Sequence, residues 1–130
     1  MNTGLQESLR QGIEEFNSER FFEAHEAWEL VWLASAGDEK RFLQGIIQIA
    51  AAFHHYQRDN WTGACSLLKA GLERLRDAPP SHAGIALEPL RREASEWAQA
   101  LQQGRDLGRA SLPKIAAAPP VGNDDRLGEG

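Results

Sequence analysis

Apolar side chains recur every three or four residues along most of this chain, and this spacing constrains its fold more than any other feature. The first run consists of Leu5, Leu9, Ile13 and Phe16. An α-helix completes a turn in about 3.6 residues, so side chains at this spacing form one apolar stripe on a helix. The pattern therefore predicts a fold assembled from amphipathic helices.

Four later segments show the same period, and residues that favour turns or helix ends separate them. Asp38 is expected to cap the third helix, Pro79 and Pro80 to end the fourth, and Gly104 to cap the fifth. We expect an all-α fold, a compact single domain of about five helices built on two antiparallel helical hairpins. The expected helices run from Leu5 to Phe16, Glu19 to Leu33, Glu39 to Gln57, Thr62 to Leu75 and Leu87 to Gln103.

The composition supports helices over strands. The chain has ten β-branched residues (two Val, six Ile and two Thr) against nineteen Ala and fifteen Leu. Strands favour the first group and helices the second, so an all-β or parallel-sheet fold is excluded. With 130 residues, the chain is long enough for one domain and too short for two ordinary ones.

The chain divides into three expected regions. A helical domain occupies residues 1–104, where the periodic pattern is clear. In residues 105–118 the apolar Leu107, Leu112 and Ile115 are spaced for an extended segment that docks on the helices. Residues 119–130 are dominated by Gly, Pro and Asp, so we expect a disordered tail there.

Charge limits the classes of partner. The net charge is −5, and residues 1–65 hold five basic against ten acidic residues. Nucleic acids and anionic membranes attract basic surfaces, so neither is an expected partner. No apolar run of the sequence is long enough to span a bilayer, and we expect no secretory signal near Met1. The lone Cys65 forms no internal disulfide, which favours the cytoplasm.

The segment from Phe21 to Glu29 contains the most informative polar residues. On a helical wheel that starts at Phe21, His25 lies at about 40° and Glu29 at about 80°, inside an arc shared with Phe22 and Trp32. Glu26 lies at the rim of that arc. Burying a lone carboxylate is costly, so Glu29 is expected to point into the aromatic core and to need a partner there.

The next helix offers candidate partners. Gln44, Gln48 and His55 share one of its faces, with Arg41 at the edge. This face is either exposed to solvent or packed on the preceding helix. The small residues Gly45, Ala51 and Ala52 would allow a close approach of that helix, in which case the two sets of polar groups would satisfy each other.

Two kinds of chemistry fit such a cluster. His25, Glu26 and Glu29 resemble half of the zinc-binding His-Glu-x-x-His helix, and His25, Glu29 and His55 could hold a divalent metal with one position open for water. The alternative is a hydrogen-bonded network that fixes how the two helices pack. Outside the cluster, His54 and Cys65 are expected to pack in the interior and His82 to be solvated in a loop.

One internal similarity is visible. The residues Ile13, Phe16, Phe21, Ala24 and Trp28 recur forty residues later as Phe53, Tyr56, Trp61, Ala64 and Leu68. Both segments predict two helices joined by a tight turn, with Ala at the helix crossing. They resemble tetratricopeptide-like hairpins, although two units are fewer than a solenoid usually needs. An interaction module with a groove for a partner helix or peptide is therefore a further hypothesis.

Two sequence blocks carry a resemblance to a known family. They are Phe21-Phe22-Glu23-Ala24-His25-Glu26 and Phe42-Leu43-Gln44-Gly45-Ile46-Ile47-Gln48, accompanied by Phe16-Asn17, Glu29, Ala51-Ala52, His55, Asn60 and Gly63-Ala64. Over residues 5–76 the chain resembles the bacterial and archaeal family called domain of unknown function 309. The resemblance implies a compact helical domain with no assigned activity. The family's polar motif positions fall on His25, Glu26, Glu29, Gln44, Gln48 and His55.

These observations leave three functional hypotheses. In the leading one, the domain has no assigned activity, and the cluster is a structural hydrogen-bond network that lines a small cleft between the second and third helices. The alternatives are a metal-binding protein or metal-dependent hydrolase, with His25, Glu29 and His55 as ligands, and the interaction module. A homodimer is also compatible, because a small helical domain with four Trp can leave apolar surface exposed.

Overall fold

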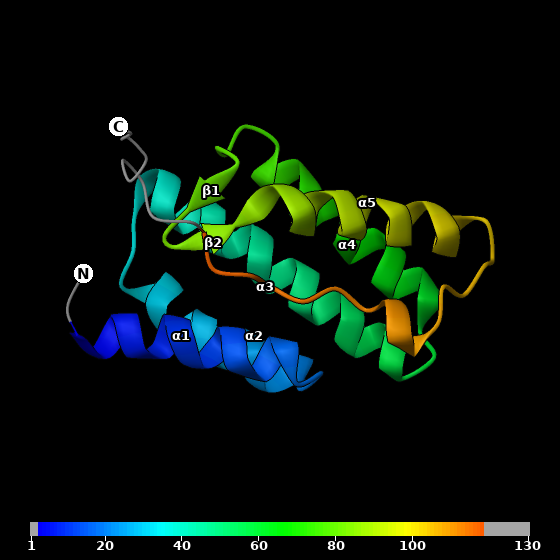
Figure 1. The fold of residues 1–130 in the computed structure, drawn as a ribbon, viewed down its shortest axis with the longest axis horizontal. Helices are drawn as coiled ribbons and strands as arrows, with labels where there is room; N and C mark the ends of the chain where they lie inside the picture. Colours follow the sequence, from blue (N-terminus) through cyan, green and yellow to red (C-terminus); the bar gives the residue numbers. More distant parts are fainter. Residues whose placement is uncertain (1–2, 119–130) are drawn as a thin grey trace, which may run out of the picture.

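Five α-helices account for most of the chain in the computed structural model, which describes residues 3–118 (Figure 1). The expected all-α fold is confirmed, and every helix end lies within two residues of its expected position. The prediction that Asp38 caps the third helix is wrong, since α3 begins at Gly37 and Asp38 lies in its first turn without capping it. The helices are α1 (Thr3–Asn17), α2 (Phe21–Leu33), α3 (Gly37–Gln57), α4 (Trp61–Leu75) and α5 (Leu87–Gln102).

A two-stranded hairpin stands where the sequence indicated only an irregular break. Strands β1 (Ser81–His82) and β2 (Ile85–Ala86) pair antiparallel between α4 and α5. The turn between them has positive φ at both Ala83 (52°) and Gly84 (78°), which is the twist that two-residue hairpin turns require. Two-residue strands are too short to show an alternating apolar pattern, so the sequence could not have predicted them.

The two helical hairpins, α1–α2 and α3–α4, turn in the same way. Glu19 and Asp59, forty residues apart, both adopt left-handed backbone conformations with φ of 66° and 61°. The amide of the next residue bonds back to the carbonyl five residues earlier, from Arg20 to Glu15 at 2.8 Å and from Asn60 to His55 at 2.9 Å. The internal similarity in sequence thus corresponds to a repeated turn at the end of the first helix of each hairpin.

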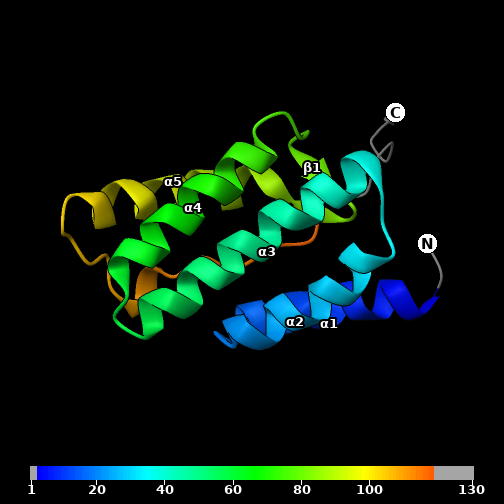
Figure 2. The same cartoon turned by 180° about the vertical axis from the view of Figure 1, so that it is seen from behind.

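Helix α3 lies between α2 and α4, as the view from behind shows (Figure 2). Its contact with α4 is very close, because a side-chain carbon at Gly71 would lie 2.8 Å from the carbonyl oxygen of Gly45. At Gly45 such a carbon would lie 2.7 Å from Leu75. The expectation that Gly45 would let α2 approach α3 is therefore wrong, since this glycine makes room for α4.

Aromatic rings fill the space between the helices. Phe16 packs edge-on against Phe21 with ring centroids 4.9 Å apart, and Phe53 packs against Trp97 of α5 at 5.6 Å. Trp28 is fully buried, and its indole N–H donates to the carbonyl of Leu9 at 3.1 Å. These rings join the first three helices and α5 into one core.

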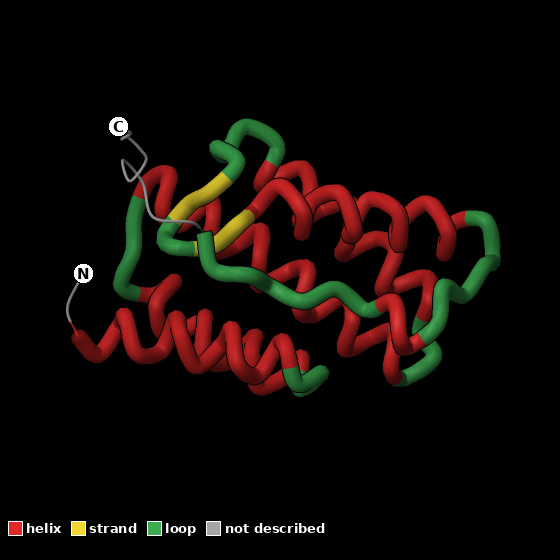
Figure 3. Tube along the Cα trace, in the orientation of Figure 1, coloured by secondary structure: helices red, strands yellow, loops and turns green. Residues whose placement is uncertain are grey.

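The segment after α5 runs back along the bundle and reaches the β-hairpin (Figure 3). It contains a short 3₁₀ helix, Arg109–Ser111, and buries Leu112 and Ile115. The Asn17 side chain forms hydrogen bonds to the Ile115 N–H at 2.7 Å and to its carbonyl at 2.9 Å. The division into a domain over 1–104 and a docking segment over 105–118 stays a prediction, and the tail expected over 119–130 lies outside the described residues.

Within residues 3–118 no helix combines the length and the apolar character that crossing a membrane requires.

The Gly45–Gly71 contact predicts a sensitive position. Replacing Gly71 with Ala places a methyl group against the Gly45 carbonyl and Ile49, both within 3 Å, so α3 and α4 must separate. Such overpacking costs about 1–3 kcal/mol of unfolding free energy, which urea denaturation measures. Ser66→Ala, at an exposed position of the same helix, is the control and should leave stability unchanged or slightly higher. Equal stability of Gly71→Ala and wild type would contradict this close packing.

The environment of Tyr56 predicts that the stability of the fold depends on pH. Burial, together with the hydrogen bond from its hydroxyl to Asp106 at 2.5 Å, raises its pKa to about 12. Because the folded-state pKa exceeds the unfolded value of about 10, this contribution to stability is complete below pH ~10 and is lost as the pH rises towards about 12. The tyrosinate absorbance of this single tyrosine reports the titration directly.

In Asp106→Asn the Tyr56 pKa should fall but stay above that of a free tyrosine, because burial is its largest cause. Asp59→Asn is the matched control and should shift the titration less, since Asp59 makes the smallest contribution. An unperturbed Tyr56 titration in the wild-type protein would show that this hydroxyl is solvated.

Candidate functional site

His25 lies on the side of α2 that faces α3. Its ring stacks on Phe22 with centroids 5.6 Å apart, and Phe22 in turn contacts His54 of α3 at 5.3 Å. The His25 Nε2 atom lies 3.4 Å from a carboxylate oxygen of Glu29, one turn further along α2. The structure thus brings together two predicted members of the cluster on one helix, with His25 half-buried and Glu29 exposed.

Glu29 does not point into the aromatic core. Its side chain is 51% exposed, and no polar or charged residue of the described chain is buried. The expected buried carboxylate is therefore wrong, because the core stripe of α2 lies on the other side of Phe21. The centre of that stripe is about 120° from Glu29 on the helical wheel. It consists of Phe21, Ala24, Trp28 and Val31.

Two buried polar atoms of the predicted cluster have no hydrogen-bond partner among residues 3–118. They are Nδ1 of His25 on α2 and Oε1 of Gln48 on α3. A buried polar atom without a partner costs about 1–3 kcal/mol. Gln48 thus does not form the hydrogen bonds with the α2 carboxylates that the sequence suggested.

The other predicted members face separate surroundings. His55 forms a hydrogen bond through Nδ1 to the Asn60 side-chain amide at 3.0 Å. The Asn60 side-chain oxygen accepts the Gly63 N–H at 3.0 Å and caps α4. Gln44 lines a shallow pocket beside Lys40 and Trp32. Glu26 lines a different groove, between α1 and α2.

The proposed metal ligands His25, Glu29 and His55 are not brought together. Because α2 and α3 are antiparallel, Phe22 lies opposite His54, and His55 is level with the start of α2, about one turn from His25. Within residues 3–118 no three His, Cys, Asp or Glu side chains are grouped so that they could hold a metal ion.

Among the other sequence candidates, Cys65 is half-buried, with Sγ 3.5 Å from the Ala98 carbonyl. His54 is half-buried as well, and burial together with the nearby Arg58 charge lowers its pKa. His82 was expected in solvent, but the β-hairpin folds it back onto α3. There its Nε2 lies 2.9 Å from Glu39 and its ring 4.4 Å from that of Phe42. The sequence lacked any signal of this contact.

Sequence reasoning missed the surface of α2 that faces solvent beside α1. A groove of about 450 Å³ follows this surface, lined mainly by glutamates and leucines. Its glutamates are Glu15, Glu23, Glu26 and Glu29, and its leucines are Leu30 and Leu33. The available signal was the spacing of Glu23, Glu26, Leu30 and Leu33, which places them on one face of a helix.

Comparisons with known proteins find relatives without a described function. Residues 9–67 match the family described as Domain of unknown function (DUF309). An uncharacterised protein of Aquifex aeolicus (strain VF5) is 29% identical over 86 residues, which cover 65% of this chain and 26% of that protein. The chain thus spans about a quarter of the length of this relative.

A solved structure is similar over nearly its whole length. It is the crystal structure of a conserved hypothetical protein from Thermus thermophilus, with 30% sequence identity and a TM-score of 0.63. The match covers 70% of this chain and 95% of that one.

The exposure of Glu29 predicts a small effect of its removal. Glu29→Gln deletes the charge of a solvent-exposed pair with His25 and should change the free energy of unfolding by less than about 0.5 kcal/mol. Urea denaturation at neutral pH measures this, with Glu96→Gln at an exposed position of α5 as the control. Breaking a buried ion pair costs about 3–5 kcal/mol. A loss of stability of that size would contradict the exposed position of Glu29 and support a buried carboxylate.

Proposed function

The chain belongs to the family Domain of unknown function (DUF309), for which no activity is assigned, and we propose that it is a protein-binding domain whose partner docks on α2. The exposure of α2 is the observation that carries the proposal. Among residues 3–118, the large hydrophobic side chains that remain exposed are Phe22, Leu30 and Leu33, at 45%, 59% and 69%. All three belong to this one helix, and Leu30 and Leu33 line the groove, whereas Phe22 lies outside it beside His25 and His54. Clustered exposed apolar side chains mark interaction sites more often than scattered ones do.

The negative charge of the glutamates beside the leucines indicates a partner with cationic side chains. Four glutamates line the same groove, and neither Glu23 nor Glu26 forms an ion pair within residues 3–118. Glu15 is paired with Arg20, and Glu29 with His25. The groove therefore attracts cationic side chains and repels anions.

The unpaired glutamates and the exposed leucines lie at different positions along the axis of α2. Leu30 follows Glu23 by seven residues, which is about 10 Å along the helix axis. The complementary ligand is an amphipathic protein segment with apolar side chains at one end and Lys or Arg about two turns away. A helix laid into a groove presents side chains at this spacing.

Other partners fit the groove less well. Its glutamates oppose a nucleic acid, in agreement with the acidic first half of the chain. A homodimer through Leu30 and Leu33 would bury the leucines but leave Glu23 and Glu26 without cations. The tetratricopeptide-like hypothesis also placed the partner in a groove of the hairpins, and the groove that we propose lies between α1 and α2 of the first hairpin. With one cysteine, half-buried Cys65, we expect the domain to work in the cytoplasm.

For the predicted polar cluster we propose a structural role, without a metal. The supporting contact is the hydrogen bond that the Asn60 side-chain amide donates to Nδ1 of His55, because Asn60 caps α4 and the imidazole orients its side chain. The pair of His25 and Glu29 supports the middle of α2 in the same local way.

Binding of a labelled peptide tests the docking proposal. The probe is a helical peptide that carries two leucines one turn apart and several lysines two turns away from them. Fluorescence anisotropy measures the Kd of this peptide for the protein. The double variant Glu23→Lys/Glu26→Lys should weaken binding at least about tenfold, equivalent to about 1.4 kcal/mol. Glu96→Lys on α5 is the matched control and should leave the Kd unchanged. Raising the salt concentration should weaken binding to the wild type.

A second variant separates the apolar contribution. Leu30→Ser/Leu33→Ser removes two exposed side chains, so it should weaken peptide binding while the melting temperature stays close to that of the wild type. Failure of the wild-type protein to bind the peptide, or equal binding by a peptide of scrambled order, would overturn the proposal. A dimer detected by light scattering would also overturn the proposal if Leu33→Ser dissociates it, because a second copy of the chain would then occupy α2.

A further inference from the structure

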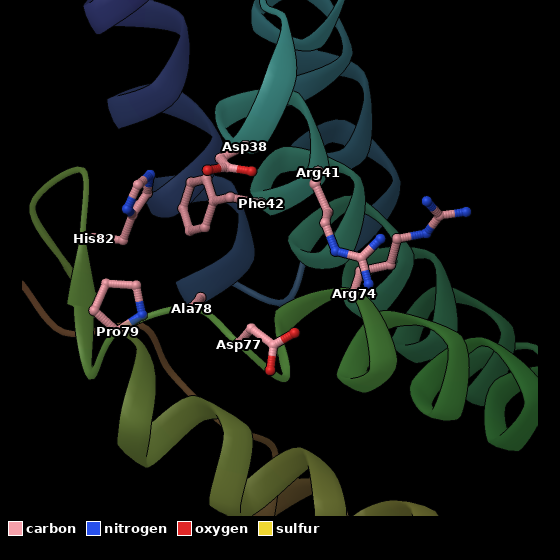
Figure 4. A pocket seen from close by; sticks show the side chains of 8 residues that line it. All are labelled: Asp38, Arg41, Phe42, Arg74, Asp77, Ala78, Pro79 and His82. Carbon is pink, nitrogen blue, oxygen red and sulfur yellow. The ribbon is translucent and has the colours of Figure 1, made fainter.

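A second cavity lies at the opposite end of α3 from the His55–Asn60 contact. It has a volume of about 370 Å³ and is bounded by the first turns of α3, the end of α4 and the β-hairpin. Figure 4 shows two arginines on one side of it, and Phe42, Pro79 and His82 on the other. None of these residues belongs to the α2 groove, so the cavity is independent of the docking surface.

The two arginines come from neighbouring helices. Arg41 lies in the second turn of α3 and Arg74 in the last turn of α4, and both side chains line the cavity. Arg41 donates one long hydrogen bond, of 3.4 Å, to the carbonyl of Glu73. Arg74 forms no hydrogen bond or ion pair within residues 3–118. Two neighbouring cations with unused donors repel each other, and an anion bound between them would remove that cost.

Two carboxylates also line the cavity, and each is balanced elsewhere. Asp77 lies 3.6 Å from the Arg76 guanidinium, outside the cavity lining. Asp38 lies in the first turn of α3, where the positive end of the helix dipole favours a negative charge. Within residues 3–118 neither carboxylate forms an ion pair with Arg41 or Arg74, although all four side chains line the cavity.

The wall facing the arginines is mainly apolar. Phe42 is 3% exposed, and the ring of His82 packs over it with centroids 4.4 Å apart and the two ring planes tilted by 51°. The contact of His82 Nε2 with Glu39 at 2.9 Å holds the imidazole in place. A planar ring of a ligand would fit against this wall while its charged group reaches the arginines.

A smaller pocket of about 270 Å³ continues on the far side of the arginines and shares both of them. It adds a third cation, Lys40, whose ammonium lies 4.1 Å from the centre of the Trp32 ring. Three cations therefore border one connected surface in a chain whose net charge is −5. Phosphate oxygens match the forked donor geometry of arginine, as carboxylate oxygens do.

We propose that this cavity, which we call the arginine pocket, binds a small organic phosphate that carries a planar ring. The phosphate lies between Arg41 and Arg74, and the ring packs beside Phe42 and His82. The volume of the pocket lies within the range of small-molecule sites. The proposal assigns a ligand class to the domain independently of the partner on α2.

Titration with phenyl phosphate, followed by amide chemical shifts in NMR spectra of the full chain, tests the proposal. We expect saturable shifts at Arg41, Phe42, Arg74 and His82. Inorganic phosphate should shift the arginine region with weaker affinity, because it lacks the ring, and phenol should bind weakly at best, because it lacks the charge. Arg74→Gln should weaken phenyl phosphate binding about tenfold or more. Arg92→Gln, at an exposed position of α5, is the charge-matched control and should have no effect.

Several results would overturn the assignment. One is the absence of saturable shifts with phenyl phosphate, and another is saturation at residues remote from the pocket. Equal affinity of wild type and Arg74→Gln, or of wild type and Arg41→Gln, would also overturn it, because the phosphate is placed between these two guanidinium groups. Unchanged amide spectra away from residue 74 confirm that the variant is folded. The Glu23→Lys/Glu26→Lys variant should bind phenyl phosphate normally, which separates this proposal from docking on α2.

Discussion

The burial of α3 against neighbours on more than one side is the constraint on which the rest of the structure depends. Nine of its residues are buried, and its contact with α4 is close enough to require glycine at both Gly45 and Gly71. Once α3 and α4 are fixed in this way, the opposite side of α3 remains for α2. The α1–α2 hairpin then packs through Phe16, Phe21 and Trp28 onto the ring of Phe53 and its neighbours.

This packing determines which surfaces are left for function. Helix α2 uses its core stripe on α1 and α3, so Leu30 and Leu33 remain exposed beside the glutamates of the groove. At the other side of the fold, the β-hairpin returns His82 to the start of α3, and α4 ends beside it. The hairpin and the two helix ends thereby enclose the arginine pocket. The two proposed binding surfaces are separate consequences of one helix arrangement.

The helices could be predicted because their apolar periodicity is local. The candidate site could be predicted only in part. The pairing of His25 with Glu29 follows from a spacing of one helical turn, and the structure contains it. The depth of Glu29 does not follow, because aromatic residues occupy both the core stripe and the rim of α2. Phe22 is 45% exposed, whereas Ala24, the smaller residue, is fully buried.

The sequence alone determined the fold class, the helices and the position of their turns, since each depends on residues within a few positions of one another. It also determined the similarity between the hairpins, which reappears in the left-handed Glu19 and Asp59. Only the tertiary structure decided that Gly45 faces α4, that His55 accepts a hydrogen bond from Asn60 and that Arg41 and Arg74 line one cavity. These contacts depend on how helices rotate and cross, which is set by packing between residues distant in sequence.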